Sequence, residues 1–198
     1  MNKPDVRYFV CLALFICLAA VQAPAQLVKS FNWSMSLQNV KTNETVAFSA
    51  PIRSATGEQF RLAIQPSAAS YIYVIAESPD GNDVDVLFAG SLKSGETWYS
   101  AIFELADPRG TESLFVIASL DEQKTLAQRI NNLKKNNGSS KRALMNEVYR
   151  IRSDISKFKE APEKPVLMGG AARGSEEQDQ GVEFSGLATY VKTISIEH

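Results

Sequence analysis

Between Phe31 and Ala118 the chain alternates apolar and polar residues with the two-residue period of a β-strand that has one buried face. The segments "WSMSL" and "QFRLAI" show this alternation, whereas "SYIYVIA" is apolar at nearly every position and predicts a central strand covered on both faces. Proline, glycine and asparagine interrupt the pattern at the spacing typical of a β-sandwich. Further strands are predicted for "DVDVLF", "TWYSAIFEL" and "ESLFVIAS".

After these strands the apolar residues recur every three to four positions, which indicates helices. Ser119 and Glu122 have the spacing of a capping box, so we expect the first helix to begin there. The polar break "KKNNGSS" separates two apolar stripes, which together predict a helical hairpin over residues 120–159 that packs on the sandwich. An adjacent row on the second helix, Met145, Tyr149 and Arg152, is a candidate to face a partner. The stripes are Leu126, Ile130 and Leu133, then Leu144, Val148, Ile151, Ile155 and Phe158.

Residues 160–181 are rich in proline, glycine and charge and show no period, so we predict a flexible loop there. The last segment, "LATYVKTISIEH", returns to a strand pattern, and the earlier sheet is the partner that the sequence offers it. We therefore expect residues 26–198 to form a single domain. Its predicted fold class is mainly β: an immunoglobulin-like antiparallel β-sandwich with an α-helical hairpin inserted before the last strand.

Residues 1–25 have the composition of a signal peptide. Lys3 and Arg7 precede a short apolar run, and "APAQ" provides a small-x-small cleavage site after Ala25. The apolar run has about 14 residues, whereas a membrane-spanning helix needs about 20. We therefore expect cleavage after Ala25 and export to the periplasm, the medium or the cell surface, with no membrane insertion afterwards. Both cysteines lie in this segment, so the mature protein is expected to lack disulfides and thiolate chemistry.

The charge of the chain argues against two classes of partner. The 21 lysines and arginines nearly balance the 22 aspartates and glutamates, which gives a formal net charge of −1. No run of basic residues stands out to attract nucleic acid or an anionic membrane surface. A protein partner in the bacterial cell envelope is therefore favoured over nucleic acid.

The stretch "DGNDVD" raises the question of a cation site, because it is rich in side-chain oxygens. A calcium loop needs ligands at alternate positions and a closing bidentate glutamate. Asp80, Asn82, Asp83 and Asp85 lack that spacing and that closing residue. Asp-Gly between two apolar runs is instead the strongest short-range signal for a β-hairpin. We predict a hairpin here and no metal site.

The residue types required by the common catalytic sites are missing. His198 is the only histidine, and it is the last residue of the sequence. A Ser-His-Asp triad, a Cys-His pair or a zinc site needs a base or ligand whose pKa is near neutral, and the sequence offers no second histidine for that role. No phosphate-binding or dinucleotide fingerprint occurs either. We therefore assign no catalytic, cofactor-binding or metal-binding residue and expect no cofactor. His198 is expected to cap the end of a strand or to lie in solvent.

Two alternatives to protein binding stay open. A hydrolase that uses two carboxylates needs no histidine, and Glu112 and Asp107 are candidates, although Glu112 can equally bond the backbone N–H groups of the turn before its strand. Exposed aromatic residues could instead stack on a glycan, although aromatic residues that alternate along strands usually belong to the core. These aromatic residues are Trp33, Tyr71, Tyr73, Trp98 and Tyr99.

Several short motifs occur in an order that resembles the bacterial domain family of unknown function DUF4384. "GEQFRL" leads into "YIYV" and a Pro-Asp-Gly turn, then "VLF", then "PRGTE" before an apolar strand, and finally "ISIEH". Ala89 departs from the family, which usually has a proline after Leu-Phe. The resemblance covers residues 55–120 and the last few, and it implies an accessory β-sandwich module, of a kind often attached to kinases or caspase-like peptidases, with no known catalytic residue. The matching positions are Gly57, Glu58, Phe60, Leu62, Tyr71, Tyr73, Val74, Pro79, Gly81, Leu87, Phe88, Pro108, Gly110, Thr111, Glu112, Ile194, Ile196 and His198.

Overall fold

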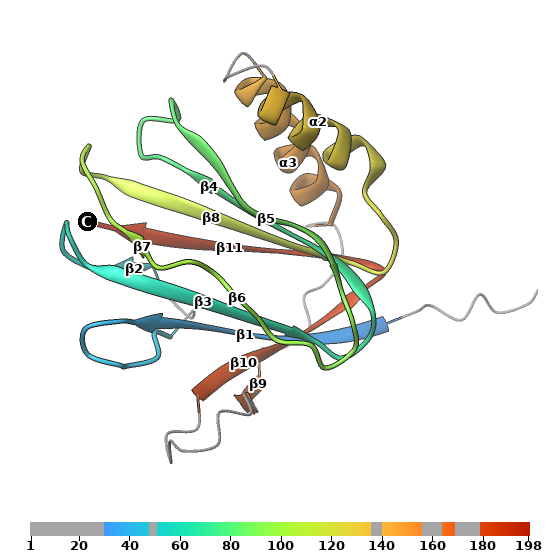
Figure 1. Ribbon diagram of the computed structural model, residues 1–198, viewed down its shortest axis with the longest axis horizontal. Coiled ribbons are helices and arrows are strands. Elements are labelled where there is room, and N and C mark those ends of the chain that lie inside the picture. Colours follow the sequence, from blue (N-terminus) through green and yellow to red (C-terminus); the bar gives the residue numbers. More distant parts are fainter. Residues whose placement is uncertain (1–29, 48–50, 136–139, 156–163, 169–178) are drawn as a thin grey trace, which may run out of the picture.

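The computed structural model describes residues 30–47, 51–135, 140–155, 164–168 and 179–198. Within these ranges the protein is mainly β, with two helices and 11 hydrogen-bonded strands, eight of which follow one another in a single path (Figure 1). The predicted fold class, a β-sandwich with a helical hairpin before the last strand, is confirmed. The strands are β1 (Ser30–Asn39), β2 (Ile52–Arg53), β3 (Gln59–Pro66), β4 (Ser70–Glu77), β5 (Val84–Leu92), β6 (Trp98–Tyr99), β7 (Phe103–Glu104), β8 (Thr111–Ser119), β9 (Lys164–Met168), β10 (Asp179–Leu187) and β11 (Thr189–Glu197).

The strand path folds into two packed sheets. The first sheet has the order β5-β4-β8-β11, and the second has the order β10-β1-β3-β6, with β7 also on β3 and β9 on β10. The sheets are joined at β10 and β11, where only Leu187 and Thr189 pair and the chain turns at Ala188, whose φ is 49°. All strand pairs are antiparallel except that of β2 with β11. The expected final strand is confirmed, because β11 pairs with β8 along its whole length.

The space between the two sheets is filled by the larger hydrophobic cluster. Alternate residues of β1 and β3 point into it from the second sheet, and alternate residues of β4, β8 and β11 enter from the first. The ring of Trp33 in β1 meets that of Tyr190 in β11 edge to face, with 5.6 Å between centroids. Each fully buried aliphatic side chain here stabilises the fold by roughly 1.5–3 kcal/mol.

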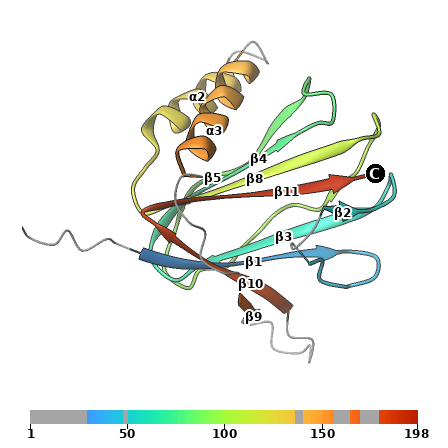
Figure 2. The ribbon, with the colours of Figure 1, turned by 180° about the vertical axis from the view of Figure 1, so that it is seen from behind.

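Helices α2 (Lys124–Lys135) and α3 (Lys141–Ile155) cover the outer face of the first sheet (Figure 2). A second hydrophobic cluster lies between them and that sheet, and it contains the residues of β4 and β8 that point away from the first cluster. The segment "SYIYVIA" is thus covered on both faces, as its sequence predicts. The predicted stripe residues Leu126, Ile130, Leu144, Val148 and Ile151 are all buried, whereas Phe158 lies outside the described residues. Met145, a candidate partner contact, is also buried in this cluster.

The predicted helix start at Ser119 is wrong. Ser119 belongs to β8, where it pairs with Tyr71 of β4 and Thr189 of β11. Its hydroxyl bonds the backbone carbonyl of Ala188 at 3.2 Å and the hydroxyl of Thr189 at 2.8 Å. Ser119 is therefore the last residue of a central strand, and its hydroxyl bonds β11 and the turn before it instead of capping a helix. Helix α2 begins five residues later, at Lys124.

The prediction of a loop over residues 160–181 is wrong in part. Lys164–Met168 forms β9, which pairs with β10, and β10 itself begins at Asp179. β9 pairs with a strand on one side only, a position that tolerates Pro165, which has no N–H to donate. The rest of the segment, like the expected signal peptide, lies outside the described residues. No helix in the described ranges is long and apolar enough to cross a membrane.

Candidate binding pocket

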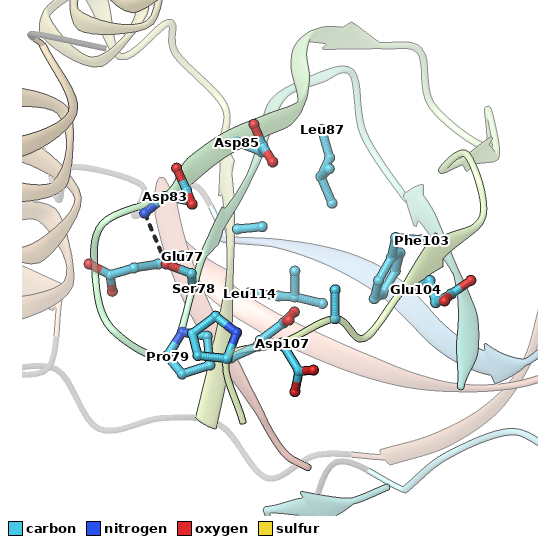
Figure 3. Close-up of a pocket in the computed structure, with 14 residues that line it drawn as sticks. Glu77, Ser78, Pro79, Asp83, Asp85, Leu87, Phe103, Glu104, Asp107 and Leu114 are labelled. Carbon is cyan, nitrogen blue, oxygen red and sulfur yellow. Dashed lines mark hydrogen bonds between the residues drawn. The ribbon is translucent and has the colours of Figure 1, made fainter. Parts of the chain in front are cut away.

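A pocket of about 250 Å³ opens at one end of the sandwich (Figure 3). One wall is the end of β4, its turn and β5, from the first sheet. The facing wall is β7 and the segment 106–108, and the start of β8 lies between them. Its apolar surface includes Leu87, Phe103 and Leu114.

Six carboxylates line this pocket, and no lysine, arginine or histidine among the described residues does so. They come from four separate stretches of sequence that the fold brings to one place. Two of them, Asp107 and Glu112, were predicted as candidates for a carboxylate pair, and the structure does place both in one pocket. The six are Glu77, Asp83, Asp85, Glu104, Asp107 and Glu112.

The turn between β4 and β5 is held by its own side chains. The Asp80 carboxylate accepts hydrogen bonds from the Ser78 hydroxyl at 2.7 Å and from the backbone N–H and side-chain amide of Asn82 at 3.0 and 2.7 Å. These donors lower the pKa of Asp80 to about 2. Gly81 follows with a φ of 69°, which favours glycine. The predicted hairpin is confirmed by the antiparallel pairing of β4 with β5.

The oxygens of this region do not converge on a metal ion. Within the described residues no group of three or more His, Cys, Asp or Glu side chains is close enough to hold one. The Asp80 carboxylate accepts hydrogen bonds from Ser78 and Asn82 within the turn. Asp83 forms an ion pair with Lys141 of α3 at 2.7 Å. What the carboxylates provide is a negatively charged surface around a small opening.

Three of the six carboxylates form an ion pair or a hydrogen bond with another described side chain. Besides the Asp83–Lys141 pair, Glu77 accepts a hydrogen bond from the Tyr149 hydroxyl of α3, and Figure 3 shows its carboxylate turned away from Phe103. Burial and this carboxylate raise the pKa of Tyr149 to about 12. Glu104 accepts a hydrogen bond from the Gln59 side chain at 2.9 Å. Helix α3 is therefore tied to one wall of the pocket by two polar contacts.

The other three carboxylates are Asp85, Asp107 and Glu112. The side chains of Asp85 and Asp107 make no hydrogen bond or ion pair with any other described residue, and both residues are exposed. Glu112 is different because its side chain is only 19% exposed. Burial raises its pKa, against the opposing effects of the nearby His198 charge and a hydrogen bond from the Ala106 backbone. This N–H group lies before Pro108 and not in the Gly110–Thr111 turn from which the donors were expected.

His198 lies beside Glu112 and is not in solvent. Its backbone N–H and carbonyl pair with Gly110 at 3.0 and 3.1 Å, which fastens the end of the chain to the turn before β8. Its side chain is fully buried, with Nε2 3.6 Å from Glu112 Oε1 and Nδ1 3.3 Å from the Thr56 hydroxyl. Nε2 has no hydrogen-bond partner among the described residues. The expectation of a strand-end position is confirmed and that of solvent exposure is wrong, because the turn and Thr56 enclose the ring.

The aromatic residues do not form a stacking platform in the described structure. Trp33 and Tyr73 are buried in the two clusters, as expected of alternating strand residues. Trp98 packs against Phe88 with 4.7 Å between ring centroids, and both are partly buried. Tyr99 is 42% exposed, and the Arg61 guanidinium lies 5.7 Å from its ring centroid.

Sequence reasoning missed Glu77 and Glu104 as members of this site. Both stand at the end of a short apolar strand pattern, where a carboxylate is an ordinary solvent-facing residue. Pro79 and Gly110, two positions of the family pattern, meet beside the pocket, so close that a Cβ on Gly110 would lie 2.7 Å from that of Pro79. The chain matches no family model, no curated protein and no solved structure. The resemblance to DUF4384 therefore stays a prediction.

Proposed function

We propose that this protein is an exported, non-enzymatic accessory module that binds another protein of the cell envelope, and that the acidic pocket is the point of contact. The observation that carries the proposal is the pocket itself: six carboxylates around an opening of about 250 Å³ with no cationic side chain of the described residues lining it. Such a surface repels acidic partners and steers basic ones toward it. The predicted signal peptide supports the envelope as the place where this happens.

The pocket offers little to support a reaction. Ser78 is the only hydroxyl side chain among the described residues that line it, and that hydroxyl is hydrogen-bonded to Asp80 and to the Asp83 backbone. No described histidine, lysine or cysteine lies there to activate it. Asp107 and Glu112 are the remaining argument for a hydrolase, since a buried carboxyl with a raised pKa suits a general acid. The volume, below the roughly 300–1,000 Å³ of small-molecule sites, argues against a sugar substrate held on several sides.

The proposal is tested by photo-crosslinking from two positions on the same strand. A photoreactive amino acid replaces Asp85 at the pocket rim or, as control, exposed Ser91 near the other end of β5. In living cells of the source organism we expect one protein to be linked from position 85 and none from position 91. The link should be lost when Asp107 is also changed to Asn.

Two results would contradict the proposal. The first is equal cross-linking from positions 85 and 91, which would show that the pocket does not select a partner. The second is hydrolysis of chromogenic glycosides that both Asp107→Asn and Glu112→Gln abolish, which would make the protein an acid-pair hydrolase. Mass spectrometry of the protein from cells tests export, since the mature chain should begin at Gln26.

A further inference from the structure

The charges of the pocket are not balanced by the part of the chain that the structure describes. Among the described residues a lysine pairs with one of its carboxylates, Asp83, whereas Glu77 and Glu104 accept hydrogen bonds from neutral side chains. Asp85, Asp107 and Glu112 have no lysine or arginine beside them in the described structure. Exposed carboxylates such as Asp85 and Asp107 are well solvated and need no partner. A carboxylate that is 81% shielded from solvent, as the 19% exposure of Glu112 implies, is costly to keep charged unless a cation approaches it.

His198 provides the second observation, because it faces Glu112 without forming a hydrogen bond to it. It is the nearest potential cation to Glu112, yet its Nε2 is 3.6 Å from the carboxylate oxygen, beyond a good hydrogen bond. That nitrogen is buried, faces Glu112 and has no other partner among the described residues. Glu112 thus has one backbone hydrogen bond, from Ala106, and the buried Nε2 that faces it lies too far away to add a second. A ligand that donates hydrogen bonds to Glu112 would complete the carboxylate.

The size and lining of the pocket restrict what that ligand can be. A volume of about 250 Å³ is too small for most metabolites and large enough for one long side chain. Leu87, Phe103 and Leu114 give the pocket an apolar part, which suits the aliphatic stem of lysine or arginine below its charged end. A bare divalent cation fits less well, because the described carboxylates do not come together as a ligand set.

We propose that the pocket binds a lysine or arginine side chain from a basic segment of the partner protein, with its charged end at Glu112 and Asp107 and its stem against Leu87, Phe103 and Leu114. This inference rests on the proposed function and specifies its partner. The rim carboxylates Asp85 and Asp107 attract the segment, and Glu112 anchors one side chain. Binding is therefore expected to weaken as salt concentration rises, since the rim is exposed to solvent.

The test uses the mature chain and a capped tripeptide, acetyl-Ala-Arg-Ala-amide. Its control is the same peptide with citrulline, which has nearly the shape of arginine without the charge. Titration followed by ¹H–¹⁵N NMR should give saturable shifts at the amides of Ala106, Gly110 and Glu112. We expect the citrulline peptide to bind at least tenfold more weakly. Equal binding of the two peptides, or shifts scattered away from the pocket, would overturn the inference.

Three variants, each with the same change in charge, separate the pocket from general electrostatics. Glu112→Gln should weaken the arginine peptide about tenfold, and Asp107→Asn should weaken it by a smaller factor. Glu122→Gln, at an exposed site beyond the other end of β8, should leave binding unchanged. Loss of the same size in Glu122→Gln would refute a specific anchor at Glu112. The NMR spectra of each variant also show whether it is folded.

The outcome can differ from that of the cross-linking experiment. If position 85 captures a partner but the arginine peptide does not bind, the protein binds a partner without inserting a basic side chain, and only this inference fails. If the peptide binds but no protein is captured, the pocket recognises a cation and the protein-binding proposal fails. Calcium chloride alone is the third probe, and tighter binding of Ca²⁺ at the same amides would replace the side chain with a metal ion.

Discussion

Two carboxylates of this protein show how the same side-chain chemistry serves different purposes. Asp80 is exposed and accepts three local hydrogen bonds, which lower its pKa to about 2 and fix the β4–β5 turn. Its contribution to stability is present above its ordinary pKa of 3.8 and is lost as the pH falls toward 2. Glu112 is shielded by its neighbours and has a raised pKa. Carboxylates with raised pKa values gather at functional sites more often than elsewhere.

The cost of charging Glu112 gives the first prediction. Because its pKa in the folded protein lies above the ordinary value of 4.5, its favourable contribution is present below that value and is lost as the pH rises through the folded pKa. Glu112→Gln removes this loss and keeps an oxygen to accept the Ala106 N–H. We therefore expect the variant to gain stability relative to the wild type between about pH 4 and pH 7, measured by urea unfolding.

Glu122→Gln is the control for this measurement. Its free energy of unfolding should change between the two pH values as that of the wild type does. A Glu112→Gln protein that is less stable than the wild type at pH 7 would show that the His198 charge outweighs the burial of the carboxylate. Greater stability together with weaker peptide binding would instead identify Glu112 as a residue kept for binding at the expense of stability.

At the scale of elements, strands and the hairpin could be predicted because their signals are local. Asp-Gly between two apolar runs specifies the β4–β5 turn, and a seven-residue apolar segment specifies β4. Ser119 matches a capping box and therefore predicts a helix start that is too early, because the sequence does not reveal that β4 and β11 both pair with this residue. The sequence does not predict β9, because its pairing with β10 stabilises a segment whose composition is that of a loop.

The turns that border the pocket depend on contacts between elements, and Gly110 gives the second prediction. Its φ is 151°, and a Cβ there would lie 2.7 Å from Pro79 Cβ. Gly110→Ala should therefore destabilise the protein by roughly 2–5 kcal/mol, since backbone strain and overlap with Pro79 add. Urea unfolding at neutral pH measures this loss.

Gly95→Ala separates the two effects in Gly110→Ala. Gly95 also has a positive φ, 73°, but a Cβ there would meet nothing within 4 Å. Gly95→Ala should therefore lower the free energy of unfolding by about 1–2 kcal/mol, the strain of a left-handed conformation alone. Equal losses in the two variants would mean that Pro79 moves aside freely and that the turns at this edge of the pocket are not held together.

At the scale of the whole molecule, the first sheet is the central layer of three. Neighbouring residues of β4 point to opposite sides, so that Ile72 and Val74 lie between the sheets and Tyr73 and Ile75 lie under the helices. The pocket depends on this arrangement, because α3 holds Glu77 and Asp83 on one wall while β7 of the second sheet forms the other. Asp107 and Glu112 could be named as candidates from the sequence, but the pocket as a whole could not be predicted, since only the fold brings its six carboxylates together.

The three-layer arrangement predicts that helices and sandwich unfold as one unit. Both tryptophans, Trp33 and Trp98, belong to the cluster between the sheets or pack against it, so fluorescence reports on that cluster. Circular dichroism at 222 nm reports mainly on α2 and α3. Leu144→Ala creates a cavity in the other cluster, under the helices, and should cost about 2–5 kcal/mol.

If the central sheet couples the two clusters, Leu144→Ala lowers the urea midpoint of tryptophan fluorescence as much as that of the helical signal. Leu62→Ala, which changes the cluster between the sheets, likewise lowers the urea midpoint of the helical signal as much as that of the fluorescence. The reason is that β4, β8 and β11 contribute side chains to both clusters, so neither layer can be lost while the other keeps its packing. A Leu144→Ala protein whose helical signal is lost first, with the fluorescence transition unchanged, would show that the helical hairpin is an independent unit. The polar ties from α3 to Glu77 and Asp83 could then not hold the pocket wall in place, and partner binding would not depend on the helices.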